Sequence, residues 1–140
     1  MIKFTSKKDW WMTLIIFGTV AISVAAVIPL FFEEINVGTI ITYLVIGLTV
    51  WLVLGIYFRT FYTVEENIVK VVSGPFRWKV PISEITSIRS TKSILSSPAL
   101  SMDRLEIKYG NYKYIIISPE DKDGFVQQIV KRNEKVQVNL

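Results

Sequence analysis

Residues 10–32, WWMTLIIFGTVAISVAAVIPLFF, and residues 35–58, INVGTIITYLVIGLTVWLVLGIYF, are two uncharged apolar stretches separated only by Glu33 and Glu34. At a rise of about 1.5 Å per residue, each forms a helix of roughly 35 Å, enough to cross a hydrocarbon core of roughly 30 Å. The sequence therefore predicts a transmembrane helix at 10–32, an extracytoplasmic loop at 33–36 and a second transmembrane helix at 37–58.

Two other interpretations of the first stretch are weaker. A buried helix of a soluble protein would be shorter and would carry polar residues on one face. A cleaved signal peptide would suit the small residues Ser23, Val24 and Ala25, but the apolar run continues to Phe32. That run is longer than the roughly 7 to 15 residues of a signal-peptide core. We therefore expect the first stretch to remain as a membrane helix.

The charges beside the two stretches predict their orientation. Lysines lie in the basic segment 1–9, Arg59 follows the second stretch, and the loop between them is acidic. By the positive-inside rule, both termini are expected in the cytoplasm. Aromatic residues flank both cytoplasmic helix ends, as in an interfacial belt: Trp10, Trp11, Tyr57, Phe61 and Tyr62.

Small residues recur at spacings of three and four on each helix and predict a face where the two backbones approach. They are Gly18, Ala21 and Ala25 on the first helix, and Gly38, Thr42 and Thr49 on the second. We expect this face to pack the hairpin on itself, while a homodimer or partner contact remains open. Neither stretch contains an ionisable group of the kind that transport pathways use.

Composition excludes several kinds of chemistry. The 140 residues include 16 Lys plus Arg, 12 Asp plus Glu, no Cys and no His. Disulfides, zinc fingers and His-dependent catalysis are therefore absent. No nucleotide-binding or nucleophile motif is present, so we expect no enzyme activity, no cofactor and no metal. A net charge of only +4, without a nucleic-acid-binding signature, argues against nucleic acid as a partner.

Residues 59–140 have the pattern of a small cytoplasmic domain. Alternating apolar and polar residues predict strands near 60–65, 68–73, 76–80, 82–91, 104–109 and 112–118. The breaks between them include Gly110-Asn111, which suits a hairpin turn with positive φ. A helix follows, with Ser118 expected as its N-cap and Pro119 in its first turn.

About six antiparallel strands followed by one C-terminal helix is the order of a pleckstrin-homology (PH)-like domain. The predicted fold is thus a membrane α-helical hairpin plus a cytoplasmic α+β PH-like domain. Its antiparallel strands would form a bent sheet or an open barrel.

Particular residues add to this order. Residues 96–110, SSPALSMDRLEIKYG, are followed by residues 117–122, ISPEDK, and by Phe125. With Ser73-Gly74-Pro75-Phe76 and Pro81-Ile82, they resemble a family of small bacterial membrane proteins that have two N-terminal transmembrane helices and a bacterial PH-like domain. That family has long been catalogued as a domain of unknown function. The resemblance covers essentially the whole chain and implies a multi-pass protein of the bacterial cell membrane.

Two sets of residues are candidate contacts for a ligand or partner. Lys70, Arg77 and Lys79 surround the 73–75 turn and could meet anionic lipid headgroups. The second set, Ser96, Ser97 and Arg104, belongs to the 93–101 loop and the strand after it, where hydroxyls and a guanidinium could meet an anion or a protein segment. The simpler explanations are a topology signal for the basic residues near the membrane and a structural role for the loop and Arg104. Besides the bilayer, the candidate partners are such headgroups and a membrane or cytoplasmic protein. Nothing in the sequence indicates a homo-oligomer.

Two functional hypotheses follow. In the first, the PH-like domain is a binding or scaffolding module at the cytoplasmic membrane face, and it docks a partner at a sheet edge or at the 93–101 loop. In the second, the protein gives immunity or stress protection against a membrane-active bacteriocin through the helical hairpin. The second rests on a resemblance of these membrane-anchored PH-like proteins to bacteriocin-immunity proteins. The hypotheses differ in which half of the chain is the working surface.

Overall fold

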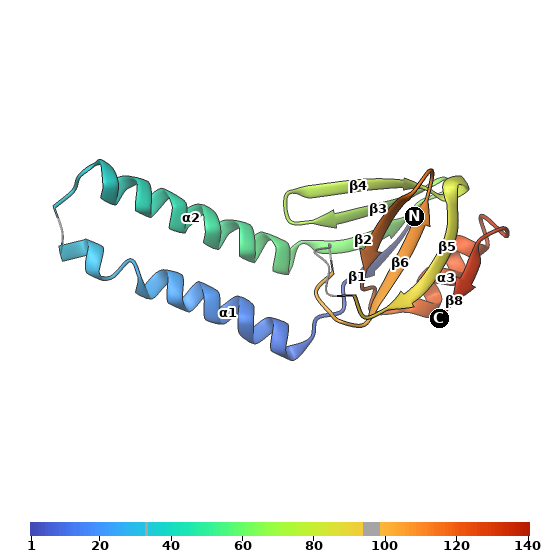
Figure 1. The fold of residues 1–140 in the computed structure, drawn as a ribbon, viewed down its shortest axis with the longest axis horizontal. Coiled ribbons are helices and arrows are strands. Elements are labelled where there is room, and N and C mark those ends of the chain that lie inside the picture. Colours follow the sequence, from blue (N-terminus) through green and yellow to red (C-terminus); the bar gives the residue numbers. More distant parts are fainter. Residues whose placement is uncertain (33, 94–98) are drawn as a thin grey trace.

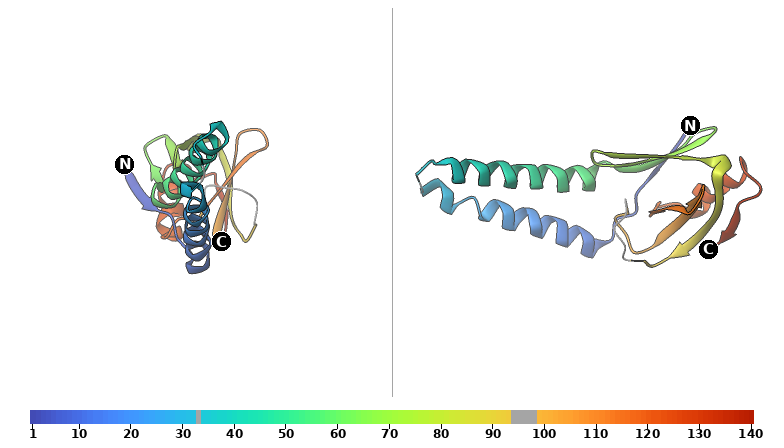
Figure 2. Two further views of the ribbon diagram at one scale, coloured as in Figure 1. Left: turned by 90° about the vertical axis from the view of Figure 1, so that its left-hand side faces the viewer. Right: turned by 45° about the horizontal axis from the view of Figure 1, so that its top comes forward.

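The computed structural model describes residues 1–32, 34–93 and 99–140. The N-terminal half comprises β1 (Ile2–Thr5), α1 (Trp10–Ala25), a 3₁₀ turn (Pro29–Phe32) and α2 (Val37–Phe58). The remaining elements are β2 (Thr60–Val64), β3 (Ile68–Ser73), β4 (Phe76–Pro81), a 3₁₀ turn (Ile82–Glu84), β5 (Ile85–Thr91), β6 (Arg104–Tyr109), β7 (Lys113–Ile117), α3 (Lys122–Val130) and β8 (Gln137–Asn139). The two long helices extend together from one end of a β-rich domain (Figures 1 and 2).

The first sheet begins with the segment that precedes the helices. Its strand order is β1-β2-β3-β4, and all its neighbours are antiparallel. β1 pairs with β2 in a register that joins Ile2 to Val64 and Thr5 to Phe61. We expected only a basic flank at 1–9. The alternation in β1 explains the difference, because Phe4 faces the core while Lys3 faces outward.

The second sheet has the order β7-β6-β5-β8, with β8 added parallel to β5. Its strands cross those of the first sheet (Figure 1). α3 packs Phe125, Val126 and Ile129 into the core. Phe125 contacts Phe4 and Tyr62 through edge-to-face ring pairs. The expected PH-like fold is confirmed, and β1 and β8 extend it beyond the strands that the sequence predicted.

The first apolar stretch is not one continuous α-helix. α1 ends at Ala25, and a 3₁₀ turn begins at Pro29. A proline ring clashes with the carbonyl four residues earlier and offers no N–H, so an α-helix cannot pass through it unchanged. Together these segments span residues 10–32, and both this stretch and α2 are long and apolar enough to cross a membrane. The α-helix therefore ends before Pro29.

α1 and α2 touch through aromatic side chains. The rings of Phe17 and Tyr57 lie 5.5 Å apart, and those of Phe31 and Tyr43 lie 6.1 Å apart. The predicted packing through the small residues is wrong. A Cβ at Gly18 would meet no atom within 4 Å, and the other small residues of the two rows are exposed: Ala21, Ala25, Gly38, Thr42 and Thr49. The two stretches therefore contact each other through these rings and not through the small residues.

The tip of the β3–β4 hairpin lies against the last turn of α2. Gly74 has φ +58°, and its N–H donates to the Arg59 carbonyl at 3.2 Å. A Cβ on this glycine would lie 2.9 Å from the Ile56 nitrogen, so a larger residue would push the hairpin away from the helix. The domain is thus fixed to the hairpin here as well as at the start of α1.

Two local predictions require correction. α3 begins at Lys122, and its N-cap is Asp121, whose carboxylate accepts the Gly124 N–H at 2.8 Å. Ser118 is not the N-cap, because its hydroxyl is used in the buried contacts described below. At the β6–β7 turn, positive φ occurs at Gly110 and Tyr112. We expected it at Gly110 and Asn111.

Candidate functional site

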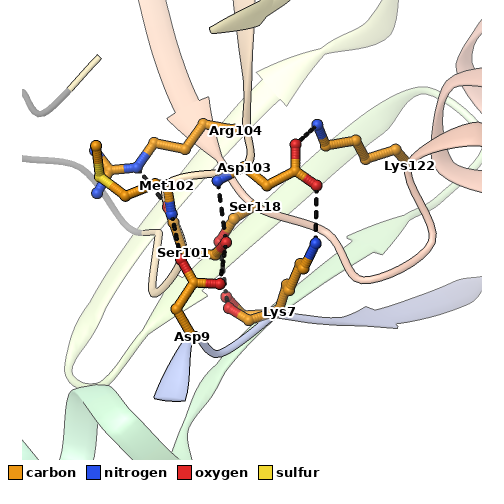
Figure 3. Close-up of polar contacts among 9 residues, drawn as sticks. Lys7, Asp9, Ser101, Met102, Asp103, Arg104, Ser118 and Lys122 are labelled. Carbon is orange, nitrogen blue, oxygen red and sulfur yellow. Dashed lines mark hydrogen bonds and ion pairs between the residues drawn. The ribbon is translucent and has the colours of Figure 1, made fainter. Parts of the chain in front are cut away.

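A cluster of polar side chains joins the start of α1 to the PH-like domain (Figure 3). We call it the polar junction. Its members are Ser6, Lys7, Asp9, Tyr62, Ser101, Met102, Asp103, Arg104, Ser118 and Lys122. The backbone adds two contacts, from Lys7 N–H to the Ser118 carbonyl at 2.7 Å and from Asp9 N–H to the Leu100 carbonyl at 3.2 Å. The chain therefore enters α1 while bound to the domain on both sides of Lys8.

Asp9 stands at the N-cap position of α1, but its side chain does not cap that helix. It reaches the domain instead, where its carboxylate accepts the Ser101 hydroxyl and the Met102 N–H, each at 2.8 Å. Burial opposes ionisation, but these hydrogen bonds and the charge of Lys7 outweigh it. The pKa of Asp9 therefore lies below its ordinary value. Asp9 fixes the start of α1 to the segment before β6.

Asp103 lies between two ammonium groups. Lys122 pairs with one carboxylate oxygen and Lys7 with the other, the latter at 3.0 Å. The Lys122 hydrogen bond, opposed by partial burial and aided by Lys7, holds the pKa of Asp103 below its ordinary value. Both Lys7 and Asp103 remain almost half exposed, so water screens the pair. Through Lys122 and Lys7, the Asp103 carboxylate links α3 and the segment before α1 to the segment before β6.

Tyr62 and Ser118 form the buried part of the junction, and both are fully inaccessible to solvent. The Tyr62 hydroxyl donates to the Ser6 hydroxyl at 3.1 Å and accepts the Ser118 N–H at 3.1 Å. The Ser118 hydroxyl accepts the Leu100 N–H at 3.1 Å. Burial raises the pKa of the Tyr62 phenol, and its hydrogen bonds offset only part of that effect.

Arg104, a predicted ligand contact, is part of this structural cluster. Only 5% of the residue is exposed, and its guanidinium donates to the Ser101 carbonyl at 2.6 Å and the Ser93 carbonyl at 2.7 Å. Burial lowers the pKa of Arg104 from its ordinary value, an effect that Tyr62 and Asp9 partly oppose. These bonds direct the guanidinium inward, away from a surface ligand. Ser96 and Ser97 lie outside the described residues.

The other predicted contacts share one face of the first sheet. Cross-strand pairing places Lys3, Thr63, Lys70 and Lys79 in one row on its outer face, and Arg77 lies in the next row. Lys70 pairs with Glu65 at 2.5 Å. Arg77 and Lys79 are exposed, and within the described part of the chain no carboxylate pairs with them. Pairing therefore gathers the three predicted cations and adds Lys3, which we did not predict.

An open groove of about 580 Å³ separates two strands that end their sheets, β4 and β7. Aromatic side chains dominate its walls, with Phe76 half exposed and in contact with Trp78 at 6.1 Å between ring centroids. Its lining residues are Ile56, Ser73, Phe76, Trp78, Tyr109, Tyr112, Lys113, Tyr114, Ile115 and Ile116. The groove thus runs from the last turn of α2 along the open side of the domain.

The β-rich domain with its closing helix defines a PH-like protein, carried on two apolar helices. Residues 60–133 match the family model described as the bacterial PH domain. The match covers more than half of the chain, so the protein belongs to the bacterial PH domain family. This confirms the resemblance found in the sequence. Neither a curated protein nor a solved structure gave a significant match.

From the sequence we did not identify Asp9, Ser101 and Met102 as site residues. Asp9 carries a usable signal, since an acidic residue directly before an apolar helix is unusual where lysines otherwise fix orientation. Its partners, Ser101 and Met102, follow 92 and 93 residues later, a separation that no local pattern spans. Among the described residues, no three His, Cys, Asp or Glu side chains gather in a way that could hold a metal ion.

Proposed function

We propose that the protein is an integral membrane protein in which both helices span the bacterial cell membrane and hold the PH-like domain at the cytoplasmic face. The exposure of the helices supports insertion. Within the most apolar window of each stretch, 0% and 6% of the residues are buried inside the protein. Such a surface is unfavourable in water and favourable in lipid.

The hydroxyl groups of the helices support the same proposal. Each Ser and Thr of α1 and α2 forms a hydrogen bond within the protein, and five of them bond to the carbonyl four residues earlier: Thr13, Thr19, Ser23, Thr42 and Thr49. Hydrocarbon offers polar groups no partner, so internal hydrogen bonding is what a membrane helix requires.

We further propose that the domain is a docking module for an extended segment of another protein. The groove between β4 and β7 carries this proposal. Both strands end their sheets in the described part of the chain, so their outer backbone groups can pair with an added strand. The exposed rings of Phe76, Trp78 and Tyr114 would receive alternate apolar side chains of that segment.

Single cysteines test the topology, because the natural chain contains none. Glu34→Cys and Glu66→Cys place a thiol in the loop between the helices and in the domain. With a membrane-impermeant maleimide on intact cells, we expect labelling of Glu34→Cys, whereas Glu66→Cys should react only after lysis. The reverse pattern would invert the orientation, and equal labelling of both would refute the spanning hairpin.

Photo-crosslinking in cells tests the docking role. A photoreactive residue at Tyr114 and one at Trp78 line opposite walls of the groove, so we expect both to capture the same protein. The Trp78→Ala substitution should remove the adduct formed from Tyr114, while the photoreactive residue at Glu66 should capture nothing specific. Adducts confined to Glu34 would contradict this proposal and favour a role of the hairpin in immunity.

A further inference from the structure

A second depression lies where the hairpin meets the domain. We call it the junction hollow. It has a volume of about 630 Å³, and its walls are Lys3, Thr5, Ser6, Lys7, Lys8, Phe58, Thr60, Phe61 and Glu120. These residues come from β1, from the segment that enters α1, from the end of α2, from β2 and from the segment between β7 and α3. The hollow is separate from the β4–β7 groove, with which it shares no lining residue.

The position of the hollow sets its depth relative to a membrane. Phe58 is the last residue of α2, and 65% of it is exposed. Trp10 begins α1 at the same end of the antiparallel hairpin, where Tyr57 also lies. Aromatic residues at helix ends occupy the level of the lipid headgroups. If the helices span the bilayer as proposed, the hollow opens at that level.

Two ammonium groups in the hollow have aromatic neighbours and no acidic partner. Lys3 Nζ lies 4.1 Å from the centre of the Phe61 ring, and Lys8 Nζ lies 4.2 Å from that of Tyr57. Within the described ranges, neither ammonium has a carboxylate at salt-bridge distance. A ring face attracts a cation without using its N–H donors, so these donors remain available to an anion.

The other charged groups of the hollow have protein partners. Lys7 is paired with Asp103. Glu120, the one acid among the lining residues, accepts the Thr5 hydroxyl at 2.7 Å and the Thr5 carbonyl accepts its N–H at 3.0 Å. These contacts hold Glu120 on β1. The excess charge of the hollow is therefore positive and comes from Lys3 and Lys8.

We propose that the junction hollow binds the phosphate of an anionic phospholipid from the leaflet that faces the domain. Lys3 and Lys8 contact the phosphate, and the exposed face of Phe58 contacts the start of an acyl chain. This inference rests on the proposed insertion of the helices. It explains why two cations lie over rings at a helix end, since an amphipathic ligand has both an anionic and an apolar part.

Native mass spectrometry of the full chain in detergent micelles tests the site, with phosphatidylglycerol and phosphatidylcholine as probes. We expect one phosphatidylglycerol to bind in preference to phosphatidylcholine. The double substitution Lys3→Gln, Lys8→Gln should weaken this binding roughly tenfold to thirtyfold, since a basic residue near the surface contributes about 1 kcal/mol. The charge-conserving variant Lys3→Arg, Lys8→Arg should retain the binding of phosphatidylglycerol. That result would show that substitution at these two positions still permits folding.

The matched control is Lys131→Gln, Lys135→Gln, which removes the same charge from exposed positions at the end of α3 and after it, outside the hollow. An equal loss in both double variants would reduce the effect to net charge and overturn the site. Equal binding of the two lipids would also overturn it. Displacement of phosphatidylglycerol by millimolar glycerol phosphate would show a soluble phosphate site and refute the lipid assignment. Lipid binding in micelles does not measure the orientation of the helices. A negative result here would therefore refute the lipid site without changing the outcome of the cysteine-labelling experiment.

Discussion

The polar junction and the outer face of the first sheet both carry lysine and arginine, but they use them differently. In the junction, Lys7 and Lys122 share the carboxylate of Asp103, and Arg104 is buried against backbone carbonyls. On the outer face, Arg77 and Lys79 are exposed, and no carboxylate pairs with either in the described residues. Cations that have protein partners maintain the architecture, whereas unpaired cations are free to meet something outside the protein.

Among the tests of this contrast, Tyr62→Phe is expected to have the largest effect on stability. The substitution keeps the ring but removes the acceptor of the buried Ser118 N–H and the donor to Ser6. Leaving a buried donor unsatisfied costs about 1 to 3 kcal/mol, so we expect the free energy of unfolding to fall by that amount. Urea unfolding of the full chain in detergent, followed by circular dichroism, measures it. An unchanged midpoint would show that the buried part of the junction does not stabilise the fold.

A smaller loss is expected for Asp9→Ala, which removes the acceptor of the Ser101 hydroxyl and the Met102 N–H. We expect a loss of about 1 to 2 kcal/mol in the same assay, because the site is only partly buried. Glu66→Gln, which changes an exposed loop carboxylate that forms no ion pair with the described residues, is the control and should change little. If both variants lost equal stability, the effect would reflect overall charge instead of the junction.

Acid should weaken the junction. Asp9 and Asp103 have pKa values below their ordinary value of 3.8 in the folded protein. Their stabilising effect is therefore complete above pH 3.8 and is lost as the pH falls through the lower folded-state pKa values. When the pH is lowered below about 4, we expect the urea concentration at the unfolding midpoint of the natural chain to fall. The midpoint of the double variant Asp9→Asn, Asp103→Asn should fall less. Parallel pH profiles would mean that other carboxylates dominate acid unfolding.

The smallest effect should come from the outer face. Arg77→Gln, Lys79→Gln removes two exposed cations that have no acidic partner among the residues the structure describes, so the free energy of unfolding should stay within about 0.5 kcal/mol. The same urea titration is the measurement. A loss of more than about 1 kcal/mol would show that these residues also hold the fold together, and the contrast between the two regions would fail.

Much of the fold could be predicted because its signals are local. The apolar stretches 10–32 and 35–58 and the alternation in β2 to β7 each lie within a short window of sequence. β1 was missed since its alternation covers only Ile2–Thr5 and its partner is β2, on the far side of both helices. β8 is three residues long and gains its place by pairing with β5.

The site was harder to predict, and Arg104 and Ser118 show why. Arg104 in the sequence has the features of an exposed basic residue at a strand entrance, and only the fold shows that it is buried. Ser118 precedes a proline and an acidic pair, the pattern of an N-cap. Its hydroxyl instead contacts Leu100 and Ser6, and Asp121 is the N-cap of α3. Tertiary contacts replaced the local ones in both cases.

The pairing of β1 with β2 has a consequence for how the protein is made. These neighbouring strands are joined by the whole helical hairpin, so in topological terms residues 6–59 are the loop of a single β-hairpin. With both helices spanning the bilayer as proposed, the first sheet is completed only after the chain has crossed to the far side and returned. A nascent chain that inserted one helix alone would leave β1 and β2 on opposite sides of the bilayer. In the proposed topology, assembly of the first sheet therefore requires that the two helices insert together.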